Sequence, residues 1–540
     1  MLGPSAHIDT FTRANLPPPE TWPEFVLSGF DYPEFVNAAV ELTDRIVEGG
    51  LGDNIALIGQ GRMRTYKELA DWTSRLARVL VEDLGIEPGN RVLIRSANTP
   101  AMVACWLAAL KAGAVVINTL PDIRAAEIAK VVDKTEAKLA LCDTRLMDEL
   151  VTAAKSSRFL KKVIGFDGTA NFDAELDRLA LGKPVRFEAV HTGRDDVAII
   201  AFSTGATGEP RAAMHFHRDL LAIADGYAKE VLGIRPDDIV VGTPPLAFTF
   251  GLGGLVAFPL RFGAASVLIE DATPADLVAE IKTYKATISV AGPSVYQRIL
   301  ALRPSPADLA SLRLAVSAGE ALPAKTFEAW TERTGIPILD GIGGTEMLHI
   351  FISNHVGDAA AGAAGRPVAG YEARVVDDSL QEKPRGEIGQ LVVRGPTGCR
   401  YLADARQTDF VRDGWNVTGD MLLQDEEGRF RFVARADDII VTDGERVAAP
   451  EVEAALKTHP SVADCAVVGI PDRARGQIVK AFVVLAPGET GSAASVKRLQ
   501  DRVKEALGPE KYPRSVRFVD ALPKTATGKV RRFLLRQVAR

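Results

Sequence analysis

From about Asn90 onward, the sequence alternates between apolar runs of strand length and segments with helical periodicity. Strand, helix and strand in this order are typical of a parallel sheet covered by helices. Proline is favoured at the first position of a helix, which supports a helix start at Pro274. The alternation predicts a large α/β body. The expected strands are 91–94, 114–118, 239–241, 265–269 and 287–291, and the expected helices are 100–112 and one that begins at Pro274.

The pattern changes after Arg385 to short apolar runs separated by glycine turns, as in 386–395 and 425–435. Such runs are typical of a small β-rich subdomain. Beyond Asp437 a compact order of helix, two strands, helix and strand predicts a second, smaller α+β domain. Its expected elements are the helices 450–456 and 493–507 and the strands 464–468, 478–485 and 516–519.

The composition excludes several classes of protein. Hydrophobic residues make up 47% and charged residues 25% of 540 residues, which fits a folded protein of more than one domain. A net charge of -6 gives no broad positive field for nucleic acid or anionic lipid. The most apolar stretch, 101–110, is shorter than the roughly 20 residues that cross a bilayer. Acids and prolines fill residues 1–25, where a secretory signal needs an apolar run, so we expect a cytoplasmic protein without nucleic-acid or membrane partners.

A loop of small residues follows the apolar run 196–202 and reads Ser203-Thr204-Gly205-Ala206-Thr207-Gly208-Glu209-Pro210-Arg211. Glycines let backbone N–H groups face a phosphate without a Cβ clash, and the hydroxyls add donors. No Lys-Ser/Thr pair follows the last glycine, so the loop is not the common G-x-x-x-x-G-K-[ST] nucleotide loop. Read alone, it fits a phosphate-binding loop and a plain glycine turn equally well.

Five further motifs follow this loop in order. They are SAGEAL at 317–322, DGIGGTE at 340–346, WNVTGD at 415–420, RADDII at 435–440 and PKTATGK at 523–529. Together with the loop they resemble the adenylate-forming superfamily of acyl-CoA synthetases, luciferases and peptide-synthetase adenylation domains, whose loop reads close to TSGTTGxPKG. The resemblance covers essentially the whole chain. It implies an ATP-dependent ligase that joins an acid to AMP and then transfers the acyl group to coenzyme A.

The resemblance also implies which residues bind ATP. A carboxylate suits the ribose hydroxyls because both of its oxygens accept hydrogen bonds. The guanidinium fork of arginine suits ribose or phosphate oxygens. The implied ATP-binding residues are Ser203, Thr204, Gly205, Thr207 and Gly208 in the loop, Gly319, Glu320 and Ala321 at the adenine, Asp340, Gly341 and Ile342 at the pocket edge, Thr345 at the phosphates, Asp420 at the ribose, and Arg435, Arg446 and Lys529.

Three of the implied residues are catalytic. Lys529 matches the lysine that bridges the acyl carboxylate and the α-phosphate, where a fixed cation stabilises developing negative charge. Thr345 would donate to phosphate, and Glu346 would hold Mg²⁺, a hard cation that is bound by carboxylate and phosphate oxygens together.

Asp437 matches the hinge about which the small domain turns between the two half-reactions. We therefore expect an N-terminal acid- and ATP-binding domain over 1–436 and a mobile C-terminal domain, which carries the catalytic lysine, over 437–540.

The phosphate loop departs from the pattern of the superfamily. Arg211 stands where a lysine is usual, Ala212 replaces a common glycine, and Ala206 replaces a hydroxyl residue that would add about 1 kcal/mol of net hydrogen bonding. Ala434 replaces the glycine before the hinge. These differences leave open a non-catalytic relative that binds nucleotide. The resemblance to peptide-synthetase adenylation domains leaves open an adenylating enzyme that loads a separate carrier protein, and a benzoate–CoA ligase or another aryl- or acyl-CoA ligase is a further alternative.

The acid site is expected to lie between 244–253, 291–294 and 347–351, which combine aromatic and small residues. Such a lining suits a flat aromatic carboxylate. The runs 244–254 and 341–351 resemble the benzoate– and 2-aminobenzoate–CoA ligases, and 16–23 is most similar to the latter. His349 fits two interpretations, a contact of an ortho amino group or a packed core residue. The sequence leaves a homodimer and a downstream acyltransferase open. The implied lining is Phe248, Phe250, Gly251, Ala291, Gly292, Gly319, Gly343 and His349.

Overall fold

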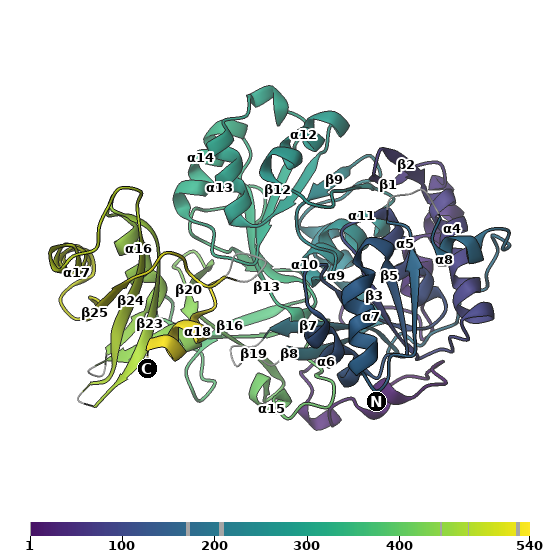
Figure 1. The fold of residues 1–540 in the computed structure, drawn as a ribbon, viewed down its shortest axis with the longest axis horizontal. Coiled ribbons are helices and arrows are strands. Elements are labelled where there is room, and N and C mark those ends of the chain that lie inside the picture. The colour runs from purple at the N-terminus through teal and green to yellow at the C-terminus, as the bar shows by residue number, and fades with distance from the viewer. Residues whose placement is uncertain are drawn as a thin grey trace. The chain divides into compact units, whose positions relative to one another are not determined.

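The computed structural model describes residues 2–168, 173–204, 210–442, 445–473, 475–524 and 530–539 (Figure 1). The described chain divides into two compact units. One holds the described residues up to Ser203 together with Pro210–Ala373 and Val393–Asn416; the other holds Arg374–Val392 and the described residues from Val417 onward. The predicted α/β body and C-terminal α+β domain are confirmed. The domain boundary at Asp437 stays a prediction.

A six-stranded sheet forms one part of the body, in the order β6-β5-β3-β4-β7-β8. Strands β6, β5, β3, β4 and β7 run parallel, and β3 and β5 are buried along their whole length, as is typical of a sheet covered on both faces. The strands are β3 (Arg91–Arg95), β4 (Val115–Thr119), β5 (Leu139–Asp143), β6 (Lys162–Phe166), β7 (Val197–Thr204) and β8 (Pro210–Phe216), and the helices between them are α5 (Pro100–Lys111), α6 (Ala125–Thr135), α7 (Met147–Ser156) and α8 (Glu175–Ala180).

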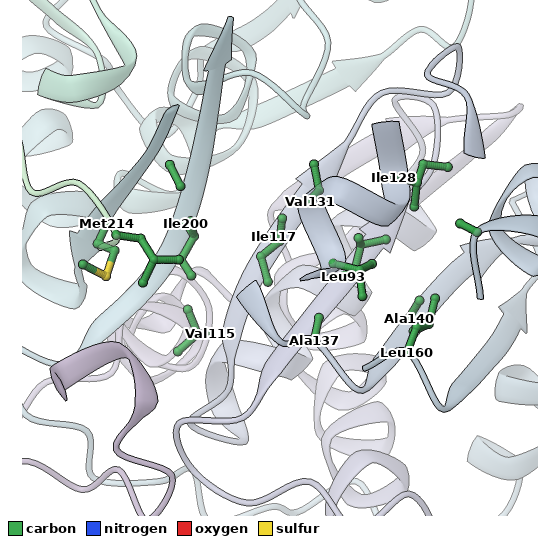
Figure 2. Packing of buried hydrophobic residues seen from close by; sticks show 14 of the residues in the cluster. Leu93, Val115, Ile117, Ile128, Val131, Ala137, Ala140, Leu160, Ile200 and Met214 are labelled. Atoms are coloured by element: carbon green, nitrogen blue, oxygen red, sulfur yellow. The ribbon is translucent and has the colours of Figure 1, made fainter. Parts of the chain in front are cut away.

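Helix α6 shows how this sheet is covered. Ile128, Val131 and Val132 follow one another at helical spacing and share a buried cluster with Leu93 of β3 and Ile117 of β4 (Figure 2). Burying one such side chain contributes about 1.5–3 kcal/mol. The alternation from Asn90 onward therefore reflects strands and helices that bury one another's apolar faces.

A nine-stranded sheet forms the other part of the body, in the order β15-β14-β13-β12-β11-β9-β10-β1-β2. Its central strands run parallel, while β2, β14 and β15 pair antiparallel at the two edges. Its strands are β1 (Ile55–Gly59), β2 (Arg62–Thr65), β9 (Ile239–Gly242), β10 (Ala265–Leu268), β11 (Ile288–Ala291), β12 (Leu314–Ala318), β13 (Ile338–Gly343), β14 (Ile350–Ser353) and β15 (Arg366–Pro367).

One helix start of this part was predicted from the sequence. Helix α12 starts at Pro274, and Thr273 and Asp276 form a capping box that satisfies its first N–H groups. The helices are α4 (Tyr66–Arg78), α9 (His217–Ile223), α10 (Thr249–Leu252), η6 (Gly253–Ala257), α11 (Phe258–Arg261), α12 (Pro274–Tyr284), α13 (Pro293–Leu302) and α14 (Ala324–Thr334).

Two smaller sheets contain the remaining strands. The first has the order β16-β17-β19-β18, with β20 paired to β19; the second has the order β22-β21-β24-β23, with β25 paired to β24. The hairpin β21–β22 was not predicted, because β22 begins with two charged residues and contains no apolar run of strand length. The bounds are β16 (Glu372–Val376), β17 (Gly389–Arg394), β18 (Val411–Arg412), β19 (Trp415–Gln424), β20 (Phe430–Arg435), β21 (Ile439–Thr442), β22 (Glu445–Ala448), β23 (Val462–Asp472), β24 (Gly476–Leu485) and β25 (Ser515–Phe518), with helices α16 (Ala449–Lys457), α17 (Ala493–Leu507) and α18 (Arg532–Ala539).

Short helical turns complete the described chain. None of the described helices is both long and apolar enough to span a membrane. The short elements are α1 (Phe11–Ala14), η1 (Pro19–Thr21), α2 (Ala38–Leu42), α3 (Asp44–Ile46), η2 (Val47–Leu51), η3 (Val79–Asp83), η4 (Thr144–Leu146), η5 (Ala224–Ala228), η7 (Pro306–Asp308), η8 (Thr345–Met347), α15 (Gln407–Phe410) and η9 (Ala436–Asp438).

Candidate active site

The carboxyl ends of β11, β12 and β13 lie side by side in the nine-stranded sheet (Figure 1). Ala291 pairs with Ser317, which in turn pairs with Asp340. Open α/β sheets bind their ligands at this edge. The sheet thus brings together three groups of predicted site residues that are far apart in the sequence: Ala291 with Gly292, Gly319 with Glu320 and Ala321, and Asp340 with Gly341, Ile342 and Gly343.

The glycines of the predicted acid pocket have two different structural roles. Gly319 has φ +91° and no atom within 4 Å of the position of a Cβ, and Gly292 has only Ala318 O at 4.0 Å. These two glycines leave open space. A Cβ on Gly251 would lie 2.2 Å from Pro245 O, and one on Gly343 would lie 2.7 Å from His349 O. At Gly251 and Gly343 the missing side chain allows close backbone contact and leaves no open space.

Asp340 is buried at the carboxyl end of β13. Burial raises the pKa of this carboxyl group to about 8, because the charged form loses its hydration. Its Oδ1 has no hydrogen-bond partner among the described residues. At neutral pH the side chain is therefore mostly protonated and presents an O–H donor, which would suit an acceptor atom of a bound base. The place of Asp340 at the edge of an adenine pocket stays a prediction.

Glu346 lies in η8, directly after β13, and its side chain is buried. Its Oε1 accepts hydrogen bonds from the Tyr401 hydroxyl at 2.6 Å and from Ser203 Oγ at 3.2 Å. The turn is fixed by His215, whose Nε2 lies 2.8 Å from the carbonyl oxygen of Thr345. A single buried carboxylate with one oxygen already held fits Mg²⁺, which takes one or two carboxylate oxygens beside nucleotide phosphates.

Several predicted residues lie outside the described residues. They include Lys529, predicted to be catalytic, and most of the predicted phosphate loop. Strand β7 leads into the loop and ends at Thr204, and β8 resumes at Pro210. Ala212 in β8 is fully buried, and its carbonyl oxygen accepts from Leu402 N–H at 2.8 Å. The loop residues outside the described chain are Gly205, Ala206, Thr207, Gly208 and Glu209.

The second unit contains the predicted ribose contact and hinge. Asp420 of β19 lies opposite Arg435 of β20, and Arg435 Nη1 donates to Asp420 Oδ1 at 2.7 Å. The two predicted ligands of the nucleotide thus pair with each other in this structure. Arg446 is exposed and lies 3.8 Å from Asp378 Oδ2. Asp437 is exposed in the single turn η9, between β20 and β21.

His349 is surrounded by aromatic rings. The ring centroid of Phe258 lies 4.4 Å away, and those of Tyr227 and Phe250 lie 5.6 Å away. Burial lowers the pKa of His349 to about 3, so the imidazole is neutral at physiological pH. Its Nε2 lies 3.3 Å from the carbonyl oxygen of Phe250, an arrangement that favours an N–H donor at Nε2. Nδ1 is then an acceptor, and it has no partner in the described chain.

The predicted aromatic residue Phe248 precedes α10, which begins at Thr249. The segment before it is held by Asn98, which donates from Nδ2 to Pro244 O at 3.0 Å and accepts from Leu246 N–H at 2.8 Å. Phe248 and Phe250 are both partly exposed. Asn98 therefore fixes the loop that carries the predicted aromatic lining.

Replacing Gly253 by alanine is expected to displace the His349 ring. A Cβ at this position would lie 2.3 Å from His349 Cδ2, and overpacking of this kind costs about 1–3 kcal/mol. We expect a lower midpoint of thermal unfolding and a raised KM for the acid. Gly49, in the similar segment η2, has no atom within 4 Å of its Cβ position and provides the matched alanine control. Equal unfolding midpoints and equal KM values for the two alanine variants would contradict the packing of His349 against Gly253.

Sequence reasoning missed three residues of this region: Asn98, His215 and Tyr401. Each contacts a predicted site segment far from it in the chain. Tyr401 and Glu346 are 55 positions apart, and no local pattern announces such a contact. Only the polar character of His215 within the apolar run 212–216 could have drawn attention to one of them.

Comparisons with known proteins agree with this geometry. Residues 47–401 match the AMP-binding enzyme family, and 451–529 match the AMP-binding enzyme C-terminal domain. The benzoate–CoA ligase of Thauera aromatica is 37% identical over 511 residues, covering 93% of this chain and 96% of that protein. The crystal structure of an anthranilate CoA ligase in complex with anthranoyl-AMP has a TM-score of 0.86 at 33% identity, covering 94% of this chain and 98% of that one.

A crystal structure of a benzoate CoA ligase from Burkholderia xenovorans is similar with a TM-score of 0.82 at 32% identity, covering 93% of this chain and 100% of that one. The match therefore extends over both parts of the chain rather than over one domain. It confirms the resemblance that the motifs indicated. The chain belongs to the AMP-binding enzyme family, and it is an AMP-forming acid–thiol ligase of the adenylate-forming superfamily.

Proposed function

We propose that the protein is an aryl acid–CoA ligase that converts 2-aminobenzoate, ATP and coenzyme A into 2-aminobenzoyl-CoA, AMP and diphosphate. The observation that supports this most directly is the neutral His349, whose Nδ1 is a buried acceptor without a partner in the described chain. An unpaired buried acceptor costs about 1–3 kcal/mol, which an amino group ortho to the carboxylate would recover. The similar proteins named above act on benzoate or anthranilate.

The proposed reaction has two steps. An oxygen of the acid attacks the α-phosphorus of ATP and diphosphate leaves, which gives the acyl-adenylate. The sulfur of coenzyme A, having lost its proton, then attacks the acyl carbon, and AMP leaves. Bound Mg²⁺ would neutralise phosphate charge. Of this chain's residues, Glu346 would hold the metal, Thr345 would donate to phosphate, and Lys529 would stabilise the negative charge that develops in the first step.

The domains would take different poses in the two steps. We propose that the C-terminal domain turns about Asp437 after adenylation, as in lid and hinge motions of other enzymes. The exposure of Asp437 itself supports this role, because few packing contacts oppose backbone rotation at an exposed residue. Asp420 and Arg435 would contact the nucleotide, and Arg435 would then exchange part of its bond with Asp420 for ribose or phosphate oxygens.

Replacing His349 by phenylalanine is expected to lower the preference for 2-aminobenzoate over benzoate. Phenylalanine keeps an aromatic ring among Phe250, Phe258 and Tyr227 but has no nitrogen acceptor. The loss of one hydrogen bond predicts a roughly three- to tenfold fall in the ratio of kcat/KM for the two acids. Any general loss of packing affects both acids and cancels in this ratio. An unchanged ratio would show that His349 is only a packed core residue.

The substrate class is tested by acid-dependent exchange of labelled diphosphate into ATP, which reports adenylation without any thiol acceptor. We expect exchange with 2-aminobenzoate and benzoate and little with medium-chain fatty acids. Exchange that is fastest with fatty acids would refute the aryl pocket. Exchange with aryl acids but no thioester on adding coenzyme A would favour the alternative enzyme, which loads a separate carrier protein. No exchange with any acid would favour a nucleotide-binding relative without activity.

A further inference from the structure

Tyr401 is the strongest hydrogen-bond donor to Glu346 in the described chain, although it belongs to none of the motifs that indicate the superfamily. Its hydroxyl lies 2.6 Å from Glu346 Oε1, while Ser203 Oγ lies 3.2 Å from the same atom. A hydrogen bond from a hydroxyl to a carboxylate at this distance is roughly twice as strong as one between neutral groups. One carboxylate oxygen is therefore fixed, and Oε2 receives no hydrogen bond from the described residues.

Packing and backbone contacts hold Tyr401 in place. Its side chain is completely buried, and its ring meets the edge of Phe410 at a centroid distance of 5.9 Å. Its N–H donates to Gln407 Oε1 at 2.9 Å. The backbone of Tyr401 also forms an antiparallel bridge with Ala213 of β8. The backbone contacts fix the position of the residue, and the ring cannot swing away from Glu346 without losing its contact with Phe410, so Tyr401 is a preorganised donor.

Arg211 adds a third member to this arrangement. Its Nη1 lies 3.4 Å from the Tyr401 hydroxyl oxygen, and its guanidinium carbon lies 5.9 Å from the centre of the ring. A cation that donates to a phenol oxygen polarises the O–H bond towards its own acceptor, which strengthens the next hydrogen bond in the chain. Arg211 is also the residue that replaces the usual lysine of the phosphate loop. The structure gives this difference a physical consequence, because the planar fork of arginine reaches the phenol.

We propose that Tyr401, supported by Arg211, is a positioning residue that orients Glu346 Oε2 towards the Mg²⁺ of the nucleotide. This inference rests on the proposed role of Glu346 as the metal-holding residue. Hydrogen-bond partners of metal-holding side chains typically change metal affinity or activity by roughly tenfold to a hundredfold when they are removed. Tyr401 acts through Glu346 and touches neither the metal nor the reacting atoms.

The test uses the full chain and the non-hydrolysable α,β-methylene analogue of ATP. Calorimetric titrations with the analogue are repeated at increasing free Mg²⁺. They give the Mg²⁺ concentration at which half of the Mg²⁺-dependent gain in affinity for the analogue is reached. Tyr401→Phe keeps the ring and its packing and removes the hydroxyl. We expect this Mg²⁺ concentration to rise roughly tenfold to a hundredfold, while the affinity for the analogue without Mg²⁺ stays the same. A purely structural effect would lower the affinity for the analogue both with and without Mg²⁺.

Two variants make the outcome decisive. Tyr66→Phe removes another buried phenol, which donates to Ala264 O at 2.7 Å, and it should leave the Mg²⁺ dependence unchanged. Glu346→Gln tests the metal role itself. If Glu346→Gln responds to Mg²⁺ as the parent does, the proposed role of Glu346 is wrong and the inference falls with it. If Glu346→Gln loses the response but Tyr401→Phe keeps it, only the role of Tyr401 is overturned.

Discussion

Replacing Lys529 by alanine lowers the rate of acyl-adenylate formation by roughly two to three orders of magnitude, the loss expected when one charge-stabilising donor is removed. In the first half-reaction negative charge builds on the oxygens between the acyl carbon and the α-phosphorus. An ammonium group fixed there stabilises the transition state more than the ground state. In the second half-reaction a thiol replaces AMP, and we expect this lysine to contribute little. Stopped-flow or quenched-flow assays that start from ATP and acid measure the first step.

The control for this prediction is the second half-reaction of the same variant. Supplied acyl-AMP and coenzyme A should give thioester at close to the parent rate. A variant whose C-terminal domain had lost its fold would be slow in both half-reactions. Equal loss of both rates would therefore contradict the assignment of Lys529 to the adenylation step.

Replacing Arg400 by methionine destabilises the protein by about 3–5 kcal/mol, because the buried Asp219 carboxylate loses its shortest ion pair and keeps only the longer contacts with Arg218 and His215. The two side chains form an ion pair and both are completely buried. Arg400 also covers the ring of Phe216, with its guanidinium carbon 3.8 Å from the ring centre. We expect the midpoint of thermal unfolding to fall by several degrees. The exposed ion pair of Arg45 and Glu48 provides a matched control, since Arg45→Met should cost about 1 kcal/mol or less.

The pH dependence of this effect has a definite sign. Burial alone would raise the pKa of Asp219, but the nearby Arg400, His215 and Arg218 lower it to about 2. A carboxyl group with a lowered pKa in the folded state adds stability above its ordinary pKa of about 4, and this stability is lost as the pH falls towards 2. The stability difference between the parent and Arg400→Met should thus be largest near neutral pH and shrink below about pH 4.

A second substitution at the same pair completes this experiment. In the double variant Arg400→Met, Asp219→Asn the buried charge is absent, and the amide oxygen can still accept from Phe216 N–H, which now bonds to Asp219 at 3.0 Å. Much of the lost stability should return. A double variant that is as unstable as Arg400→Met would show that lost packing, rather than the buried charge, causes the effect.

The sequence predicts much of the body of this fold because its strands are largely apolar along their length and regularly separated by helices. Strands β3 and β24 and helix α17 lie close to where the pattern places them. The hairpin β21–β22 escaped prediction because β22 begins with two charged residues and so contains no apolar run of strand length. The carboxyl-edge position of Gly319 and Asp340 follows from parallel strand order, so the motifs and the topology point to the same place.

Contacts between distant residues could not be predicted in the same way. Three contacts of this kind are the hydrogen bond between Tyr401 and Glu346, the ion pair of Arg400 with Asp219 and the hydrogen bond from Asn98 to Pro244. The distance along the chain between the two residues does not indicate that they meet. The roles of glycines are equally hidden. Gly319 leaves open space while Gly251 allows close backbone contact, and only the surrounding atoms distinguish the two cases.

The most direct test of the proposed function is the formation of CoA thioester from a panel of acids with ATP, Mg²⁺ and coenzyme A, followed by chromatography with mass detection. The panel contains 2-aminobenzoate, benzoate, hydroxybenzoates and medium-chain fatty acids. We predict aryl-CoA with one AMP released per thioester and the highest kcat/KM for 2-aminobenzoate. A higher kcat/KM for fatty acids, or acyl-AMP that forms without any thioester, would contradict the proposal.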